Sequence, residues 1–95
     1  MINVGMYYKV KLGSEGEFEK IFGQVVESLL SSNSGMKNAK LYREVGKSEY
    51  MILTEWENTD SFSAFIQSRG FKETTTHGKT ILEGQPKHKI FYDKI

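Results

Sequence analysis

Apolar and polar side chains alternate along the start of the chain. The even positions are apolar, namely Ile2, Val4, Met6, Tyr8, Val10 and Leu12. A period of two predicts a β-strand with one buried face. The odd positions include Gly5 and Tyr7 beside lysines, so the other face of this strand does not read as plainly solvent-facing.

The next segment, SEGEFEKIFGQVVESLLSSNSG, changes to helical spacing. Its apolar residues recur every three or four positions and charged residues occupy the other side, which predicts an amphipathic helix. Ser14, with Glu17 three residues later, is a capping-box pattern for the start of this helix. Gly35 is expected to take a positive φ and end the segment.

Period two returns in three later segments. Residues 38–45 and 48–57 are rich in β-forming side chains and flank a short glycine turn at Gly46, so they predict a hairpin. The lone proline, Pro86, precedes residues 87–95, where apolar and polar positions alternate again. This segment is predicted to be the last strand.

Two helices are predicted between the hairpin and the last strand. Residues 60–68 place aromatic and aliphatic side chains on one face, with Asn58 or Thr59 as the N-cap. Residues 71–82 contain several threonines and Gly78, which are weak helix formers. A poor or interrupted helix is predicted there.

The order strand, helix, strand, strand, helix, strand predicts an α+β, ferredoxin-like βαββαβ fold with an antiparallel sheet. Residues 1–95 are expected to form a single domain. Helices would cover one face of the sheet and leave the other open, with Tyr7 and Tyr42 on it. A small core and an open aromatic face predict a homodimer joined through the sheet faces.

Composition narrows the function. The chain has 13 Lys and Arg against 12 Asp and Glu, a balance that argues against nucleic-acid binding. It has no cysteine, and its two histidines, His77 and His88, form no metal-binding motif, so no metal site is expected. No apolar run approaches the roughly 20 residues of a membrane span, and no signal peptide is visible; a cytoplasmic location is expected.

Several stretches together resemble a known family. They are KLGSEGEFEKIF after the first strand, GMKNAKLYRE, YMILTEWENTDSFSAFIQSRGFK, and LEGQPKHKIFY near the end. With the spacing from Trp56 to Phe62 to Phe71, they resemble the antibiotic-biosynthesis monooxygenase superfamily, which includes haem-degrading monooxygenases. The resemblance implies a dimeric α/β barrel. It also implies oxygen chemistry without metal or flavin, in which a phenol, quinol or porphyrin supplies the electrons.

The haem-degrading branch of that superfamily has a signature that this chain lacks. The resemblance places its asparagine, tryptophan and iron-binding histidine at Met6, Phe65 and Thr75. No cofactor is therefore expected, and haem is disfavoured. The resemblance instead implies a substrate pocket whose wall is formed by Met6, Trp56, Phe65, Phe71 and Thr75.

His77 is the candidate catalytic residue, because histidine has an ordinary pKa of about 6.5 and can accept a phenolic proton near neutrality. An exposed histidine with no role is the competing interpretation. The aromatic residues are equally open, since Trp56 and Phe65 can serve as core as well as pocket wall.

Three functions therefore remain compatible with the sequence. The first is a cofactor-independent monooxygenase that acts on a small aromatic or quinoid compound. The second is a non-catalytic dimer of the same fold that binds a small aromatic ligand. The third is a haem-binding or haem-degrading protein with atypical ligands, such as His77.

Overall fold

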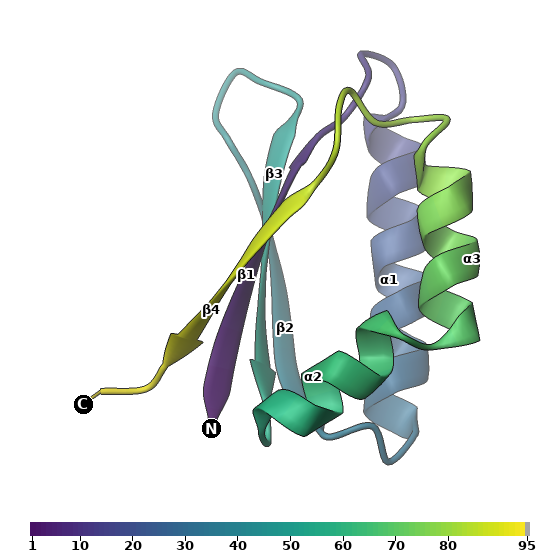
Figure 1. Cartoon of the computed structure of the whole chain (residues 1–95). Coiled ribbons are helices and arrows are strands. Elements are labelled where there is room, and N and C mark those ends of the chain that lie inside the picture. The colour runs from purple at the N-terminus through teal and green to yellow at the C-terminus, as the bar shows by residue number, and fades with distance from the viewer. Residues whose placement is uncertain (95) are drawn as a thin grey trace.

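The computed structural model describes residues 1–94, so Ile95, the last residue of the expected domain, lies outside the described residues. Four strands and three helices follow one another along the chain (Figure 1). In order they are β1 (Ile2–Lys9), α1 (Glu15–Ser31), β2 (Met36–Arg43), β3 (Glu49–Trp56), α2 (Thr59–Ile66), α3 (Arg69–Gly78) and β4 (Lys87–Tyr92). The predicted ferredoxin-like fold is confirmed, and both helices predicted between the hairpin and the last strand are present.

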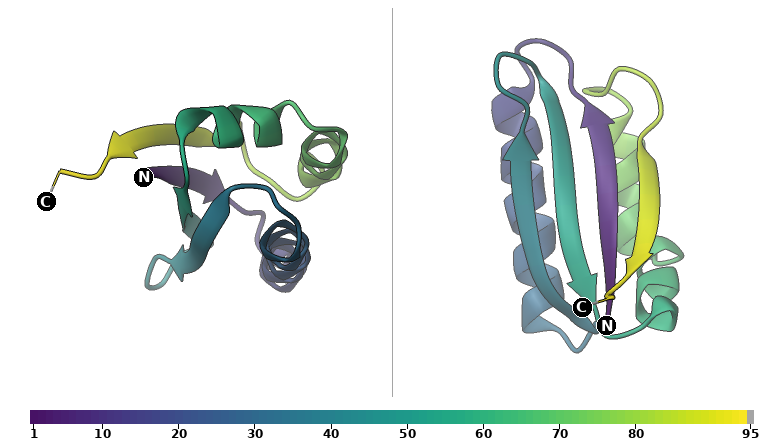
Figure 2. Two further views of the ribbon diagram at one scale, coloured as in Figure 1. Left: turned by 90° about the horizontal axis from the view of Figure 1, so that it is seen from below. Right: turned by 90° about the vertical axis from the view of Figure 1, so that its left-hand side faces the viewer.

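The strands form one antiparallel sheet in the order β2-β3-β1-β4. All three helices lie on the same side of it, and Figure 2 shows the opposite face uncovered. In an antiparallel ladder, paired residues share a face of the sheet. Because Tyr7 pairs with Met51 and with Lys87, and Met51 pairs with Tyr42, all four lie on the uncovered face.

The core lies between the sheet and the helices. Its most buried side chains are Trp56 and Phe62, each 1% exposed, and Val4. The indole Nε1–H of Trp56 donates to the Thr54 hydroxyl oxygen at 2.8 Å, and this hydroxyl donates to the Val4 carbonyl at 3.3 Å. The tryptophan that ends β3 is thus fixed both by burial and by a hydrogen-bonded chain.

The helix starts differ in part from the predictions. Ser14 makes no side-chain capping bond at α1, so the predicted capping box is wrong. The Glu15 carboxylate instead accepts the backbone N–H of Gly13 at 2.8 Å, and Glu17 turns toward α3. Asn58 caps α2 as predicted, since its side chain accepts the N–H of Ser61 at 2.9 Å.

Residues 71–82 are more regular than predicted. The α2 helix ends at Ile66, and the Ser68 side chain caps a separate helix by accepting the N–H of Phe71 at 3.2 Å. Tertiary contact overrides weak propensity here, because the Phe71 ring lies 4.9 Å from the Phe65 ring across the junction. Gly70, which lies between the two helices predicted from the sequence, is within the first turn of α3.

The remaining boundaries shift by a few residues. Gly35 has the predicted positive φ, 88°, but α1 already ends at Ser31, so Gly35 closes the connection to β2 and not the helix. Leu12 lies beyond β1 and is 90% exposed, so its predicted place on the buried face is wrong. The backbone turns into a loop at Gly13, whose φ is 93°, which ends the alternation.

Candidate functional site

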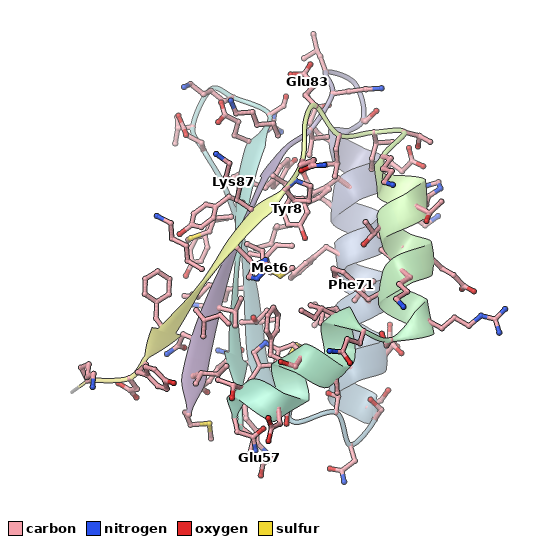
Figure 3. All side chains as sticks on the ribbon, viewed as in Figure 1. Met6, Tyr8, Glu57, Phe71, Glu83 and Lys87 are labelled. Atoms are coloured by element: carbon pink, nitrogen blue, oxygen red, sulfur yellow. The ribbon has the colours of Figure 1, made fainter. Side chains whose placement is uncertain are left out.

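A cavity of about 700 Å³ lies between the sheet and the helices α1 and α3. Figure 3 shows Met6 and Tyr8 extending from β1 toward the helices, with Phe71 facing them from the helix side. Aliphatic and aromatic side chains make up most of its lining. They include Phe18, Ile21, Phe22, Val25, Val26 and Leu29 from α1, Ile52 and Trp56 from β3, and Phe65, Phe71, Ile81 and Leu82 from the second half of the chain.

The six residues singled out in the sequence converge on this cavity. The lining includes Met6, Trp56, Phe65, Phe71, Thr75 and His77. They come from the sheet, α2 and α3, three elements that the fold brings together. Their chemical roles remain predictions, because lining the same cavity shows where the side chains lie and not what they do.

The aromatic residues form a continuous stack at one end of the cavity. The Trp56 and Phe65 rings lie 5.4 Å apart, and the Phe65 and Phe71 rings meet edge to face at 4.9 Å. Phe62 lies behind them against Trp56, at 5.6 Å, and does not line the cavity. Trp56 and Phe62 are therefore core, while Phe65 and Phe71 are core on one side and cavity wall on the other.

The start of α1 and the end of α3 lie at the same end of the molecule (Figure 1). There the His77 Nε2 atom lies 3.0 Å from the Glu17 Oε1 atom. The His77 and Glu17 side chains are 53% and 48% exposed, so the pair bridges the two helices at the rim. Since a carboxylate only accepts hydrogen bonds, a neutral His77 carries its proton on Nε2 and has its lone pair on Nδ1.

Tyr8 also lies at this end, and the sequence analysis counted it only as an apolar position of β1. Its ring lies 5.2 Å from the ring of Phe18, the residue that follows Glu17 in α1. Within residues 1–94 nothing hydrogen-bonds its hydroxyl group. Burial raises the pKa of the Tyr8 phenol to about 12, so it stays protonated at physiological pH. The sequence did contain a signal that could have identified Tyr8, namely a phenol on the strand face predicted to be buried. A tyrosine hydroxyl on such a face normally needs a hydrogen-bond partner.

A second polar cluster joins the β2–β3 hairpin to α1 outside the cavity. The Tyr50 hydroxyl donates to the Glu19 carboxylate at 2.5 Å, and burial followed by this bond raises the Tyr50 pKa to about 12. The Ser48 hydroxyl donates to the Glu15 carboxylate, which is the main cause of the lowered pKa of Glu15. Because these groups satisfy one another, the cluster reads as structural.

A family model described as antibiotic biosynthesis monooxygenase matches residues 1–76. The chain belongs to the antibiotic biosynthesis monooxygenase family. This match covers the whole sheet apart from β4, together with α1, α2 and most of α3. The family resemblance inferred from the sequence is therefore confirmed.

Solved structures agree on the fold of this monooxygenase-family chain. A conserved protein from Methanosarcina mazei superimposes with a TM-score of 0.86 at 24% identity, covering 98% of this chain and 92% of that one. SnoaB, a cofactor-independent oxygenase from Streptomyces nogalater, superimposes with a TM-score of 0.84 at 21% identity, covering 99% and 93%. At such identities the similarity establishes a shared fold.

The names of curated relatives refer to haem binding and not to oxygenase activity. A protein of Natronomonas pharaonis, provisionally named as heme-binding, is 26% identical over 85 residues, or 90% of this chain. One of Haloquadratum walsbyi with the same kind of name is also 26% identical over 85 residues. The chain spans only 14% and 16% of the lengths of these two relatives, so they match it as one part of much longer proteins.

The described residues lack the histidine that the haem-degrading signature would place here. The position to which the resemblance assigns the iron ligand is Thr75, and the nearby His77 uses its Nε2 atom on Glu17. Within residues 1–94 no three His, Cys, Asp or Glu side chains cluster as a metal site would require. Nor does any helix in that part of the chain have the length and apolarity to cross a membrane.

Proposed function

We propose that this chain is a cofactor-independent monooxygenase that oxidises a small aromatic or quinoid compound in the cavity between the sheet, α1 and α3. The observation that carries the proposal is the cavity itself. It is about 700 Å³ in volume, lined mainly by apolar side chains, and has an imidazole at its rim. Ligand sites of small aromatic molecules combine an apolar lining with a few polar groups in this way.

The proposed reaction requires a base that removes the phenolic proton of the substrate. Loss of the phenolic proton makes the ring electron-rich enough to react with dioxygen. In the overall step a ring C–H bond is replaced by a C=O bond. One oxygen atom enters the quinone product and the other leaves as water, so the phenol supplies all the electrons that reduce dioxygen.

His77 is proposed as the general base. With Glu17 holding Nε2–H, the Nδ1 lone pair is the basic site of the ring, and the carboxylate stabilises the imidazolium that forms. Trp56 and Phe65 are proposed to enclose the aromatic ring, with Met6, Phe71 and Thr75 as further wall. An apolar wall also keeps water away from the reactive anion.

Oxygen uptake tests this function. The protein, treated with a chelator, is assayed with a panel of hydroquinones and polyphenols in ¹⁸O₂, and the quinone product is examined for the label. The rate should fall at least about a hundredfold in His77→Ala, as expected for loss of a general base. His88→Ala is the matched control, because His88 packs against Phe62 at 5.6 Å and lies outside the cavity lining. Equal rates in wild type and His77→Ala would exclude His77 as the base.

The homodimer remains part of the proposal. The uncovered sheet face carries Tyr7, Tyr42 and Phe91, which are 38%, 43% and 46% exposed. Aromatic surface of this kind on a small domain favours burial against a second copy. Sedimentation equilibrium at micromolar concentration should give twice the chain mass of 10.9 kDa, and a mass of one chain would contradict the dimer.

Haem binding is the second candidate, favoured by the names of the curated relatives. A haemin titration separates the two candidates. If the cavity excludes histidine-ligated haem, the Soret band either does not shift or shifts equally in wild type and His77→Ala. A stoichiometric shift that disappears in His77→Ala would instead support haem. A tight aromatic ligand without oxygen uptake would favour the non-catalytic binding function.

A further inference from the structure

Tyr8 is the tyrosine of the cavity lining, and within residues 1–94 no other group uses its hydroxyl. The Tyr8 hydroxyl lines the cavity without a hydrogen-bond partner in the described residues, while its neighbours Met6 and Phe18 are apolar. No fully buried side-chain nitrogen or oxygen atom of the described residues lacks a partner, so water can reach this hydroxyl. A ligand that displaces that water must replace its hydrogen bond. A group kept in this state suits a ligand that arrives with the missing partner.

We infer that the Tyr8 hydroxyl donates a hydrogen bond to a ring oxygen of the ligand, and so selects aromatic compounds that carry a carbonyl or phenolate oxygen. The direction of the bond follows from the phenol's chemistry. Because burial keeps it protonated to about pH 12, Tyr8 acts as a donor and not as a base. A neutral hydroxyl can also accept a hydrogen bond, but toward a carbonyl or phenolate oxygen, which has no proton to give, it can only donate.

The location of Tyr8 explains why such a donor would help the proposed reaction. Tyr8 contacts Phe18, and the neighbouring Glu17 holds His77, so the donor and the proposed base belong to the same end of the cavity. When His77 removes the proton, negative charge develops on the ring oxygen. A pre-positioned neutral donor in an apolar cavity stabilises that charge.

The other tyrosines show why the assignment is specific. Tyr50 is on the same face of the sheet, but its hydroxyl is already bonded to Glu19. Tyr7 is the sequence neighbour of Tyr8, yet it lies on the uncovered face, where its hydroxyl covers Gly5. Of these three residues, only Tyr8 offers the cavity a free donor.

Binding without turnover tests the inference. Anaerobic calorimetry compares 1,4-naphthoquinone with naphthalene, two ligands of the same ring system with and without carbonyl oxygens. The absence of cysteine removes thiol addition to the quinone as a complication. Wild type should bind the quinone at least about tenfold more tightly than naphthalene, since a hydrogen bond lost by a ligand costs about that factor.

Tyr8→Phe should abolish that preference by weakening quinone binding about tenfold while leaving naphthalene binding unchanged. Tyr7→Phe, the control, should keep the preference. The bound quinone's carbonyl stretch should shift to lower frequency in wild type and return to its unbound value in Tyr8→Phe. An equal loss for both ligands, or an unshifted carbonyl band in wild type, would overturn the inference.

The inference rests on the proposed function only in assuming that the cavity binds an aromatic ligand. A Tyr8-dependent quinone preference without oxygen uptake would support the inference and refute the monooxygenase. Oxygen uptake that survives in Tyr8→Phe with unchanged KM and kcat would support the monooxygenase and refute the inference about Tyr8. If neither compound binds, the inference is wrong, and the labelled-oxygen assay decides the function separately.

Discussion

The two ends of the cavity differ in whether their polar groups have hydrogen-bond partners within the protein. At the aromatic end, Trp56 is 1% exposed and its indole N–H is bonded to Thr54, whose hydroxyl is bonded to Val4. At the polar end, the Tyr8 hydroxyl has no partner in the described residues and His77 keeps one ring nitrogen free of Glu17. One end satisfies its own polar groups, and the other leaves some unused.

This difference separates stability from function within a single cavity. A satisfied, buried polar chain resists change because each partner would be left unpaired by the loss of the other. Unused groups at the rim contribute little to folding and remain available to a ligand. Substitutions at the aromatic end should therefore act on the folded state, and substitutions at the polar end on binding and rate.

The largest effect is expected from Trp56→Ala. It removes the largest fully buried side chain and opens a void beside Phe62, which typically costs about 3–5 kcal/mol. Urea denaturation followed by circular dichroism measures the loss. A change below about 1 kcal/mol would show that the aromatic end is wall and not core.

Thr54→Val should come next, with a loss of about 1–3 kcal/mol. The substitution is nearly isosteric but leaves the Trp56 indole N–H without an acceptor in a buried site. Thr75→Val is the matched control, because Thr75 faces the cavity from α3 and has no side-chain hydrogen bond in the described residues. Equal losses in both variants would contradict the proposed division between the two ends.

The free energy of unfolding should depend on pH in the alkaline range because of Tyr8 and Tyr50. Both folded-state pKa values are raised to about 12, against an ordinary value of about 10 in the unfolded chain. Between these values the unfolded state has released protons that the folded state retains, so the free energy of unfolding falls as pH rises from about 10 to about 12.

Below pH 10 neither tyrosine contributes any slope. Ultraviolet titration should detect two late ionisations among the five tyrosines, one lost in Tyr8→Phe and the other in Tyr50→Phe. Tyr8→Phe should melt at nearly the wild-type temperature at neutral pH, because no internal hydrogen bond is removed. A cooperative loss of structure in that variant would place Tyr8 with the core.

The smallest effect on stability is expected from Glu17→Gln. An ion pair this exposed typically contributes less than about 1 kcal/mol, so the melting temperature should barely change. Oxygen uptake should nevertheless fall, by less than in His77→Ala, because the imidazole loses the carboxylate that orients it. Unchanged uptake would show that the His77–Glu17 pair has no part in the reaction.

Much of the fold was predictable because its periodicities are strong. The alternation in β1 and the apolar stripe of α1 gave the right elements, and Asn58 was correctly assigned as a cap. What failed depends on contacts distant in sequence. Glu17 does not cap α1 because His77, sixty residues later, takes its carboxylate, and α3 is regular because Phe71 packs on Phe65.

The candidate site was predictable in its membership but not in its polarity. Met6, Trp56, Phe65, Phe71 and Thr75, the wall that the resemblance implied, line one cavity together with His77, and their roles remain predictions. The sequence could not reveal that the Trp56 indole is satisfied while the Tyr8 hydroxyl is not. That distinction depends on which backbone and side-chain groups the fold brings within reach, and these come from Thr54, Val4 and Phe18.

The α3 helix has a consequence for how this chain can change over generations. It contains no buried residue, yet Phe71, Thr75 and His77 all face the cavity from it. Substitutions at Thr75 and His77 carry small folding costs, whereas Phe71 also packs against the core. Substitutions at these positions can therefore change one wall of the cavity while the sheet stays the same. Proteins that share this fold can evolve to bind different ligands through changes in this one helix.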